Sequence, residues 1–175
     1  MMHKNKLREL VKQKRLILCK SGEIDTISEK IVNNILNSDI FIKSENIALY
    51  YPLKGEVDLR TLLKCNKNFY LPKCIDNELF FAKYDGYLKQ GCFSVAEPIG
   101  GIINPAILDV IYIPCLCANK RLYRLGYGKG FYDRFFQKYN LHAKKIIVCP
   151  KCFITDKFHE DKFDYKCDFI VSDSL

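Results

Sequence analysis

The segment DVIYIPCLCANKRLYRLGYGKGFYDRFFQKY, residues 109–139, decides the fold. It begins with DVIYIP at 109–114, which after Asp109 is a short, continuous apolar run, typical of a strand that is buried on both faces. Residues 131–139 predict a helix, and a loop of about ten residues followed by the stretch RLGYGKG separates the two elements. Strand, long loop and helix in this order indicate an α/β protein, in which the loops after the strands bind ligands.

Other parts of the chain repeat this alternation of strands and helices. Apolar spacing predicts helices at 5–20 and 59–65, and a capping box of Thr26 and Glu29 predicts the start of another helix, which ends near 37–39. Residues 91–105 are rich in Gly and Pro and predict a long loop. Further strand-like runs lie at 46–51, 68–72, 78–84, 144–150 and 168–172. We therefore expect an α/β fold: a single three-layer domain over residues 1–175, with a largely parallel central sheet flanked by helices.

The composition is that of an ordinary folded protein. Hydrophobic residues make up 49% of the 175 residues and charged residues 27%, both close to globular averages. No apolar run approaches the roughly 20 residues of a membrane span, and the polar start lacks the core of a signal peptide, so we expect a cytoplasmic protein without membrane contact. The formal net charge of +8 favours anionic partners such as nucleotides. Because the basic residues are spread along the chain, the pattern argues against a dedicated nucleic-acid-binding tail.

Nine cysteines without an export signal indicate reduced thiols rather than a disulfide framework. Cys149 and Cys152 form a CPKC sequence, but a zinc site needs a second pair or histidines, and the chain has three histidines in all. A redox pair at a helix start is another functional interpretation, and buried or incidental thiols are the simpler one. The simpler interpretation also fits Cys115 and Cys117, which follow the strand at 109–114.

The glycine-rich stretch has the parts of a phosphate-binding loop. Gly126, Gly128 and Gly130 let backbone N–H groups come close to a ligand, the helix start adds a positive dipole, and Lys129 adds a charge. The stretch is not a Walker A loop, since no Ser or Thr follows the lysine. Asp133, just inside the first helical turn, has the side chain to hold Mg²⁺ against bound phosphates. The alternatives are a flexible turn with a solvated lysine, and an aspartate that only stabilises the helix start.

Together with other short sequences in the same order, this stretch resembles the 5-formyltetrahydrofolate cyclo-ligase family, also called 5,10-methenyltetrahydrofolate synthetase. The matching sequences span nearly the whole chain: KNKLR at 4–8, YYPLKGEVDL at 50–59, YLPK at 70–73, EP at 97–98, RLGYGKGFYDR at 124–134 and DYKCDFIVSD at 164–173. The loop from Cys115 to Tyr123 is unusual, because Cys115 and Leu122 stand where the family usually has glycines. Phe131 and Phe163 replace a tyrosine and a histidine that are common in the family.

The resemblance implies an ATP-dependent cyclo-ligase of one-carbon metabolism. The enzyme would use ATP and Mg²⁺ to close 5-formyltetrahydrofolate to 5,10-methenyltetrahydrofolate through a phosphorylated formyl (imidate) intermediate, with release of ADP and phosphate. Carried over position by position, the resemblance implies Lys129 and Arg124 as catalytic residues and Asp133 and Asp168 as magnesium ligands. For Asp164 we expect a structural role rather than metal binding. The implied ATP contacts are Lys4, Asn5, Lys6, Leu7, Arg8, Arg124, Leu125, Gly126, Tyr127, Gly128, Lys129, Gly130, Phe131 and Tyr132. The implied folate contacts are Tyr51, Glu56, Tyr127, Gly128, Lys129, Gly130 and Phe131.

Two other classes of function remain open from the residues. One is a different ATP-dependent small-molecule ligase or kinase, which would share the glycine loop and differ in the acceptor. The other is a basic module that binds a nucleotide or nucleic acid without turnover and uses tyrosines for stacking. That module explains poorly why Asp133 lies beside a glycine-flanked lysine, and it predicts binding to oligonucleotides that weakens steeply with salt. We expect small-molecule substrates, no nucleic acid and a monomeric chain.

Overall fold

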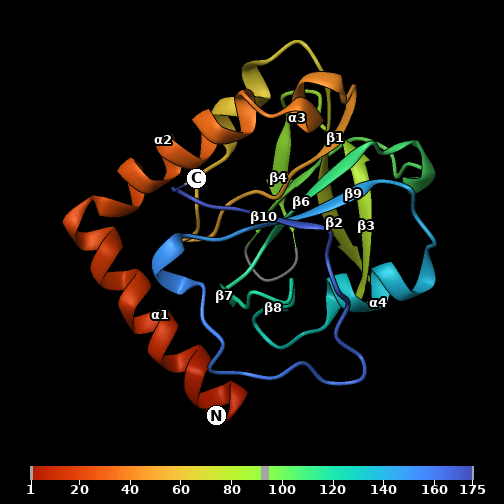
Figure 1. Cartoon of the computed structure of the whole chain (residues 1–175). Coiled ribbons are helices and arrows are strands. Elements are labelled where there is room, and N and C mark those ends of the chain that lie inside the picture. The colour runs from red at the N-terminus through yellow and green to blue at the C-terminus, as the bar shows by residue number, and fades with distance from the viewer. Residues whose placement is uncertain (1, 92–94, 175) are drawn as a thin grey trace.

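A six-stranded sheet forms the centre of the computed structural model, which describes residues 2–91 and 95–174 (Figure 1). The strands lie in the order β10-β9-β6-β1-β2-β3. Their bounds are β1 (Asn46–Ala48), β2 (Asn68–Ile75), β3 (Glu78–Lys83), β6 (Val110–Pro114), β9 (Lys144–Val148) and β10 (Phe169–Val171). Neighbouring strands are parallel except β2 and β3, so the prediction of a largely parallel sheet is confirmed.

Helices cover both faces of this sheet. The α-helices are α1 (Lys4–Ser21), α2 (Glu23–Leu36), α3 (Asp39–Lys43) and α4 (Phe131–Lys138), and short 3-10 helices lie at η1 (Arg60–Lys64), η3 (Pro105–Ile107) and η4 (Lys151–Phe153). In Figure 1, α1 and α2 lie to the left of the sheet and α4 lies to its right. The start of α1 packs with α4 in one core cluster, and α2 packs in the cluster on the opposite face. Within the described residues, no helix is both long and apolar enough to cross a membrane.

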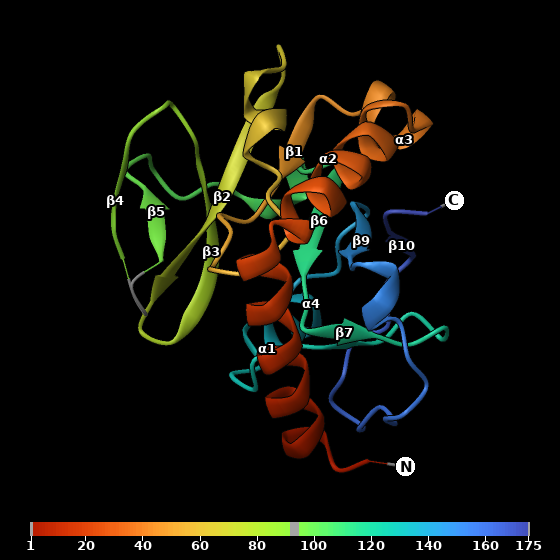
Figure 2. The same cartoon turned by 90° about the vertical axis from the view of Figure 1, so that its left-hand side faces the viewer.

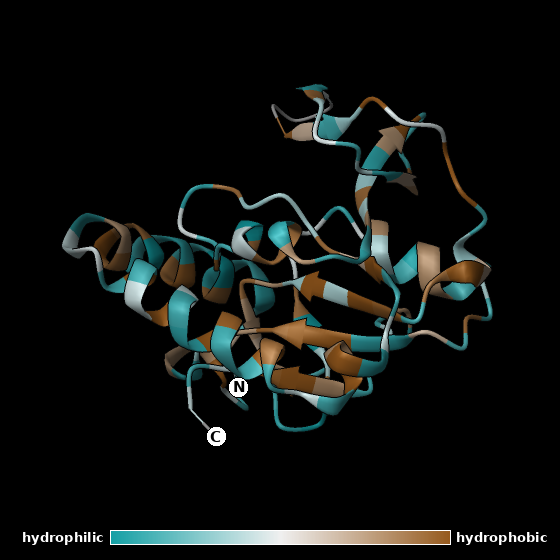
Figure 3. Cartoon of the chain, turned by 90° about the horizontal axis from the view of Figure 1, so that it is seen from above, coloured by the Kyte–Doolittle hydropathy of each residue, from teal (hydrophilic) through white to brown (hydrophobic). Residues whose placement is uncertain are grey.

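Alternation of side chains along the strands builds a core on each face of the sheet. Ile111 packs in a cluster with Phe135 of α4 and Val11 of α1, whereas its neighbour Tyr112 packs on the opposite face with Ile31 of α2. Figure 3 shows the result: the strands are mostly brown, and the exposed sides of the helices are teal. Burial on both faces explains why the strand sequences are continuous apolar runs.

The start of α2 differs from the sequence prediction. Gly22, with a φ of 75°, is the N-cap of α2, and Thr26 and Glu29 lie inside the helix, so the predicted capping box is wrong. The same left-handed glycine ends α1, which is the usual glycine stop, and the chain then enters the next helix at once. The helix predicted at 59–65 is the 3-10 helix η1 rather than an α-helix.

The predicted loop at 91–105 is partly regular structure. Within it, β5 (Ala96–Pro98) pairs antiparallel with β4 (Leu88–Gln90), and Figure 2 shows this small sheet beside the β2–β3 hairpin. Contacts far along the chain decide this, since Oε1 of Glu97 accepts the backbone N–H of Cys74 in β2 at 3.1 Å. Residues 92–94 of the predicted loop lie outside the described residues.

Candidate active site

One cavity of about 350 Å³ lies at the carboxyl ends of the central strands. Its wall includes Tyr50 after β1, Pro114 at the end of β6, and every residue from 124 to 133. The carboxyl edge of parallel strands is the usual ligand-binding edge of an α/β sheet. Tyr51 and Glu56 line the same cavity, so the structure brings the predicted folate residues and the predicted phosphate loop together.

Local pairing shapes the glycine stretch. β8 (Arg124–Leu125) pairs antiparallel with β7 (Cys117–Ala118) directly ahead of the glycines. Gly128 and Gly130 have φ angles of 97° and 67°, which residues with a Cβ rarely adopt, and Gly130 is the N-cap of α4. The positive end of α4 therefore points into the loop, which is the arrangement of anion sites at helix starts.

Arg124 and Asp133 form an ion pair across the glycine stretch. Nη2 of Arg124 lies 3.0 Å from Oδ1 of Asp133, and the arginine side chain is only 4% exposed. The same Oδ1 atom accepts the backbone N–H of Tyr165 at 3.1 Å, and the guanidinium lies 5.6 Å from the ring centre of Tyr132. These contacts fix both residues at the cavity wall, with Oδ2 of Asp133 left out of the two bonds.

Arg134 forms a hydrogen bond with the backbone of Lys129 in the glycine loop. Its Nη1 atom donates to the carbonyl oxygen of Lys129 at 2.7 Å, and Nη2 donates to the carbonyl of Asn77 at 3.0 Å. Asn77 and Asp76 have positive φ angles and form the turn of the β2–β3 hairpin. The hairpin thus supports the loop that carries Lys129.

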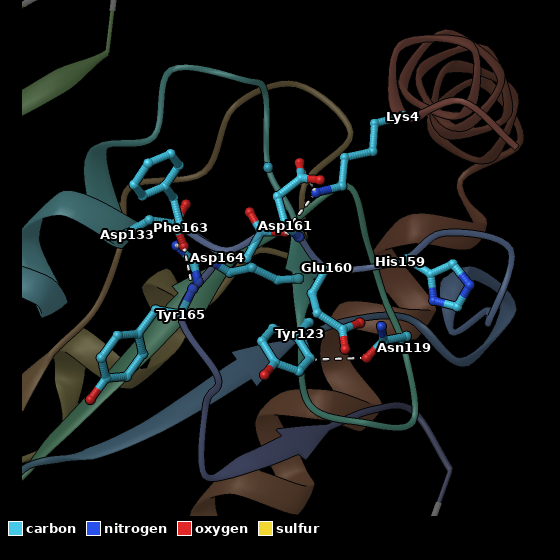
Figure 4. A network of polar contacts seen from close by, with 12 residues as sticks. Lys4, Asn119, Tyr123, Asp133, His159, Glu160, Asp161, Phe163, Asp164 and Tyr165 are labelled. Carbon is cyan, nitrogen blue, oxygen red and sulfur yellow. Dashed lines mark hydrogen bonds and ion pairs between the residues drawn. The ribbon is translucent and has the colours of Figure 1, made fainter.

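The first turns of α1 contribute two basic side chains near the cavity: Arg8 lines it, and Lys4 binds the cavity-lining Asp164. Nε of Arg8 donates to the carbonyl of Gly126 at 3.0 Å, and Arg8 lines the cavity. Nζ of Lys4 lies 2.6 Å from a carboxylate oxygen of Asp161 and of Asp164, and Figure 4 shows Lys4 pointing from α1 toward Asp161. Burial opposes the charged lysine, but the hydrogen bonds to both carboxylates raise its pKa overall. The Lys4 ammonium is therefore held by two carboxylates, one of which, Asp164, lines the cavity.

Three other residues of the predicted nucleotide segment lie away from the cavity wall. Asn5 supports Arg8, since its Oδ1 accepts from Nη1 of Arg8 at 2.6 Å. Leu7 is buried in the core, and Lys6 is exposed to solvent. Of the residues at 4–8, the structure places Arg8 alone in the cavity lining.

Glu56 is a buried carboxylate on the folate side of the cavity. It is 7% exposed, and its Oε2 accepts the backbone N–H of Leu53 at 2.8 Å. Burial raises the pKa of this carboxyl, while the Leu53 N–H, the charge of Arg15 and the hydroxyl of Tyr127 act in the opposite direction. Tyr51 lies nearby with its ring under the guanidinium of Arg60 at 5.5 Å.

The two predicted magnesium ligands have different surroundings. Asp133 lines the cavity, whereas Asp168 precedes β10, where its Oδ2 accepts the backbone N–H of Lys145 at 2.8 Å. No group of three or more His, Cys, Asp or Glu side chains in the described residues is arranged to hold a metal. Magnesium needs few protein carboxylates when phosphates and water fill its other positions, so the oxygen donor of Asp133 fits it. Convergence of Asp133 and Asp168 on one ion stays a prediction.

The sequence analysis missed one residue of the site, Arg15, and gave another, Asp164, a structural role only. Asp164, predicted to be structural, binds Lys4 and also lines the cavity. Arg15 is 4% exposed and donates to backbone carbonyls beside the cavity. A signal for Arg15 was present, because it lies at helical spacing in line with Leu7 and Val11, where an apolar side chain is the usual choice.

The CPKC cysteines have unlike environments. Cys149 is buried at the end of β9, and Cys152 is exposed in η4. Burial raises the pKa of both thiols. All eight cysteines in the described part of the chain are free thiols, while Cys92 lies outside it.

Comparisons with known proteins agree with this geometry. A sequence profile of the 5-formyltetrahydrofolate cyclo-ligase family matches residues 1–172. The chain is 30% identical over 181 residues to a 5-formyltetrahydrofolate cyclo-ligase of Mycoplasma genitalium, with 98% of each chain covered. It is 33% identical over 181 residues to the corresponding Mycoplasma pneumoniae protein, with 98% of this chain and 99% of that one covered.

Solved structures show the same fold. An NMR structure of the 5,10-methenyltetrahydrofolate synthetase of Aquifex aeolicus matches with a TM-score of 0.88 and 33% identity, over 99% of this chain and 91% of that chain. A 5,10-methenyltetrahydrofolate synthetase from Mycoplasma pneumoniae matches with a TM-score of 0.81 and 29% identity, over 99% and 100% of the two chains. The resemblance seen in the sequence is confirmed: this chain belongs to the 5-formyltetrahydrofolate cyclo-ligase family, a family of enzymes.

Proposed function

We propose that this enzyme uses ATP to close 5-formyltetrahydrofolate to 5,10-methenyltetrahydrofolate, with release of ADP and phosphate. One observation carries the proposal: a single cavity is lined both by the glycine loop and by Tyr51 and Glu56. A phosphate-binding loop and a buried carboxylate in one cavity suit a reaction that joins a nucleotide to a polar organic acceptor.

In the proposed reaction, phosphorylation converts the formyl oxygen, a poor leaving group, into a phosphate, which is a good one. The oxygen of the N5 formyl group attacks the γ-phosphorus of ATP, and the bond to the ADP oxygen breaks. The resulting phosphorylated imidate carbon is then attacked by N10 of the folate, which loses its proton as the ring closes. Phosphate leaves with the former formyl oxygen, so the atoms and electrons balance. Phosphoryl transfer of this kind depends on positioning and on neutralisation of charge.

Side chains of the cavity match these needs. Lys129 and the loop amides would neutralise the moving phosphate, and Arg124 would act from the wall, where Asp133 already holds it. Magnesium, when bound with ATP, would further neutralise the phosphates, with Asp133 and Asp168 as its proposed ligands. Glu56 would accept a hydrogen bond from the pterin, beside the aromatic ring of Tyr51.

Turnover of purified protein tests the proposal. Incubation with 5-formyltetrahydrofolate and Mg-ATP should produce the near-ultraviolet absorbance of the methenyl product, together with one ADP for each product molecule. Omission of ATP should abolish the product. Release of ADP with another acceptor but not with 5-formyltetrahydrofolate would instead identify a different ligase or kinase, and nucleotide binding without ADP release would identify a binding module.

A variant of Glu56 tests which substrate this side chain meets. Glu56→Gln keeps the size of the side chain but removes the charge, so it should weaken binding of 5-formyltetrahydrofolate much more than binding of Mg-ATP. Calorimetric titration of each ligand separately decides this. Equal loss of both affinities, or loss of neither, would remove Glu56 from the folate site.

We also propose a cytoplasmic location for the enzyme. The eight free cysteines of the described residues are usual in a reducing compartment, which favours the cytoplasm. We propose a monomer with small-molecule substrates and without nucleic acid. Light scattering would give the oligomeric state, and unchanged mobility of oligonucleotides at low salt would support the absence of nucleic-acid binding.

A further inference from the structure

Arg15 is a buried cation that is bound by backbone carbonyls. It is 4% exposed, its Nη1 donates to the carbonyl of Gly55 at 3.2 Å, and its Nη2 donates to the carbonyls of Cys115 and, at 3.0 Å, Leu116. The guanidinium also lies 5.3 Å from the ring centre of Phe153. Because these partners are neutral, they satisfy Nη1 and Nη2 of Arg15 without cancelling its positive charge, while its buried Nε has no hydrogen-bond partner among the described residues.

The three carbonyls belong to two segments that line the cavity. Gly55 directly precedes Glu56, and it packs so closely on α1 that a Cβ at this position would lie 3.3 Å from Cβ of Arg15. Cys115 and Leu116 follow β6 and lead into the β7–β8 ribbon ahead of the glycine loop. Arg15 thus ties α1 to both sides of the cavity at once.

The turn that carries Glu56 is closed on itself and rests on Arg15. The backbone N–H of Glu56 donates to the carbonyl of Leu53 at 2.9 Å, and the Leu53 N–H donates to the Glu56 carboxylate at 2.8 Å. These two bonds close the turn between Leu53 and Glu56, and the bond from Arg15 to Gly55 connects this turn to α1. Loss of that bond would displace the carboxylate together with its turn.

The charge of Arg15 also acts on the Glu56 carboxylate. The groups that face Glu56 are the Arg15 guanidinium from α1 and the hydroxyls of Tyr50, Tyr127 and Tyr132. Of these four groups, only Arg15 carries a charge, and its positive charge favours the ionised carboxylate against the effect of burial.

We propose that Arg15 is a positioning residue for the folate side of the cavity: it fixes the Gly55–Glu56 turn and provides the buried positive charge opposite the Glu56 carboxylate. The inference rests on the proposed function, in which Glu56 meets the folate. Arg15 acts through Glu56 and does not itself line the cavity wall.

Two substitutions of Arg15 distinguish the effect of its hydrogen bonds to the turn from the effect of its positive charge. Arg15→Met removes both the bonds to the carbonyls and the charge, whereas Arg15→Lys keeps the charge and loses the forked geometry. Lys14→Met is the matched control, since Lys14 is the exposed neighbour of Arg15 on α1. For each folded variant, titration calorimetry gives the affinities for 5-formyltetrahydrofolate and for Mg-ATP as a function of pH.

Arg15→Met should weaken folate binding about tenfold or more with little change for Mg-ATP. It should also move the acid limb of the folate affinity to higher pH, because the Glu56 pKa rises when the opposing cation is lost. Arg15→Lys should weaken folate binding but leave the acid limb in place, and Lys14→Met should change neither. In a Glu56→Gln background, Arg15→Met should lose most of its effect on folate affinity and all of its effect on the acid limb.

Three outcomes would overturn the inference. They are wild-type folate affinity in Arg15→Lys, equal loss of both ligands in either variant, and an undiminished effect of Arg15→Met when Glu56 is already Gln. If Arg15→Met does not fold, the folate affinity of Arg15→Lys is compared in the wild-type and Glu56→Gln backgrounds instead, and the same criteria apply. Failure of the proposed function is distinct, because the wild-type protein itself would then not bind 5-formyltetrahydrofolate.

Discussion

Nη2 of Arg124 lies 3.0 Å from Oδ1 of Asp133, so an ion pair joins the two ends of the glycine stretch. Arg124 belongs to β8 and Asp133 to the first turn of α4. The pair therefore closes the loop that carries Lys129 by joining β8 to α4. The arginine side chain is almost fully buried, and this carboxylate is its counter-charge.

Asp133→Asn should reduce both stability and magnesium use. The amide leaves the buried Arg124 without a counter-charge, and because Asp133 is 25% exposed we expect a loss of about 1–3 kcal/mol in the free energy of unfolding. Urea denaturation measures this loss. In turnover assays the variant should need a higher magnesium concentration for half-maximal rate.

Asp168→Asn and Asp164→Asn separate metal binding from structure. If Asp168 shares the ion with Asp133, its variant should also need more magnesium, whereas Asp164→Asn should keep the wild-type requirement and lose stability through Lys4. A normal magnesium requirement in Asp168→Asn would remove Asp168 from the metal site.

Lys129→Ala should impair Mg-ATP use while the fold stays intact. Loss of one charge-assisted contact to phosphate costs on the order of 2–3 kcal/mol, and Lys129→Arg should restore only part of it. Lys30→Ala on the exposed side of α2 is the control. Wild-type turnover by a folded Lys129→Ala protein would contradict the role of the loop lysine.

Gly128→Ala should damage the loop more than Gly126→Ala. Gly128 has a φ of 97°, where a Cβ is strained by about 1–3 kcal/mol, and its Cβ would lie 3.5 Å from Cζ of Arg8. Gly126 lacks a positive φ and has open space at the Cβ position. Thermal unfolding and Mg-ATP affinity of the two variants should differ accordingly, and equal behaviour would show that the loop does not need its left-handed residue.

Glu56 should make stability depend on pH in a defined direction. Burial raises the pKa of its carboxyl above the ordinary 4.5, so the folded state holds this proton more tightly than the unfolded state. The wild type should therefore lose stability relative to Glu56→Gln as pH rises from 4.5 through the raised pKa, and the difference should be constant below that window. Parallel urea titrations across this range check the sign, and a difference that changes in the opposite direction contradicts it.

At position 122, a glycine variant should be more stable than an alanine variant, which is the reverse of the usual order of stability. Leu122 has a φ of 72°, in the region that favours glycine, and it stands in the loop where the family usually has one. Leu122→Gly should thus be more stable than Leu122→Ala by about 1 kcal/mol. At the exposed helical residue Leu16, the glycine variant should be the less stable one by a similar amount. Melting of the four variants tests both orders.

The sequence by itself determined the central strands, the longer helices and the glycine loop. Runs such as 110–114 and 146–148 are apolar at every position because both faces of their strands are buried, and that information is local. The glycines at 128 and 130 are also local signals, since their backbone angles exclude most other residues. The capping box failed because Gly22 ends one helix and begins the next, and the box has no such backbone constraint.

Only the tertiary structure decided which distant residues meet. The strand order β10-β9-β6-β1-β2-β3 and the antiparallel position of β3 depend on packing of whole elements rather than on spacing within one. Arg15 meets the carbonyl of Leu116, and Lys4 meets Asp164 more than 150 residues away in the chain. The sequence alone can indicate a buried arginine on a helix, because the arginine interrupts an apolar stripe. It does not indicate which groups the arginine binds, because hydrogen bonds between distant residues produce no periodic pattern in the sequence.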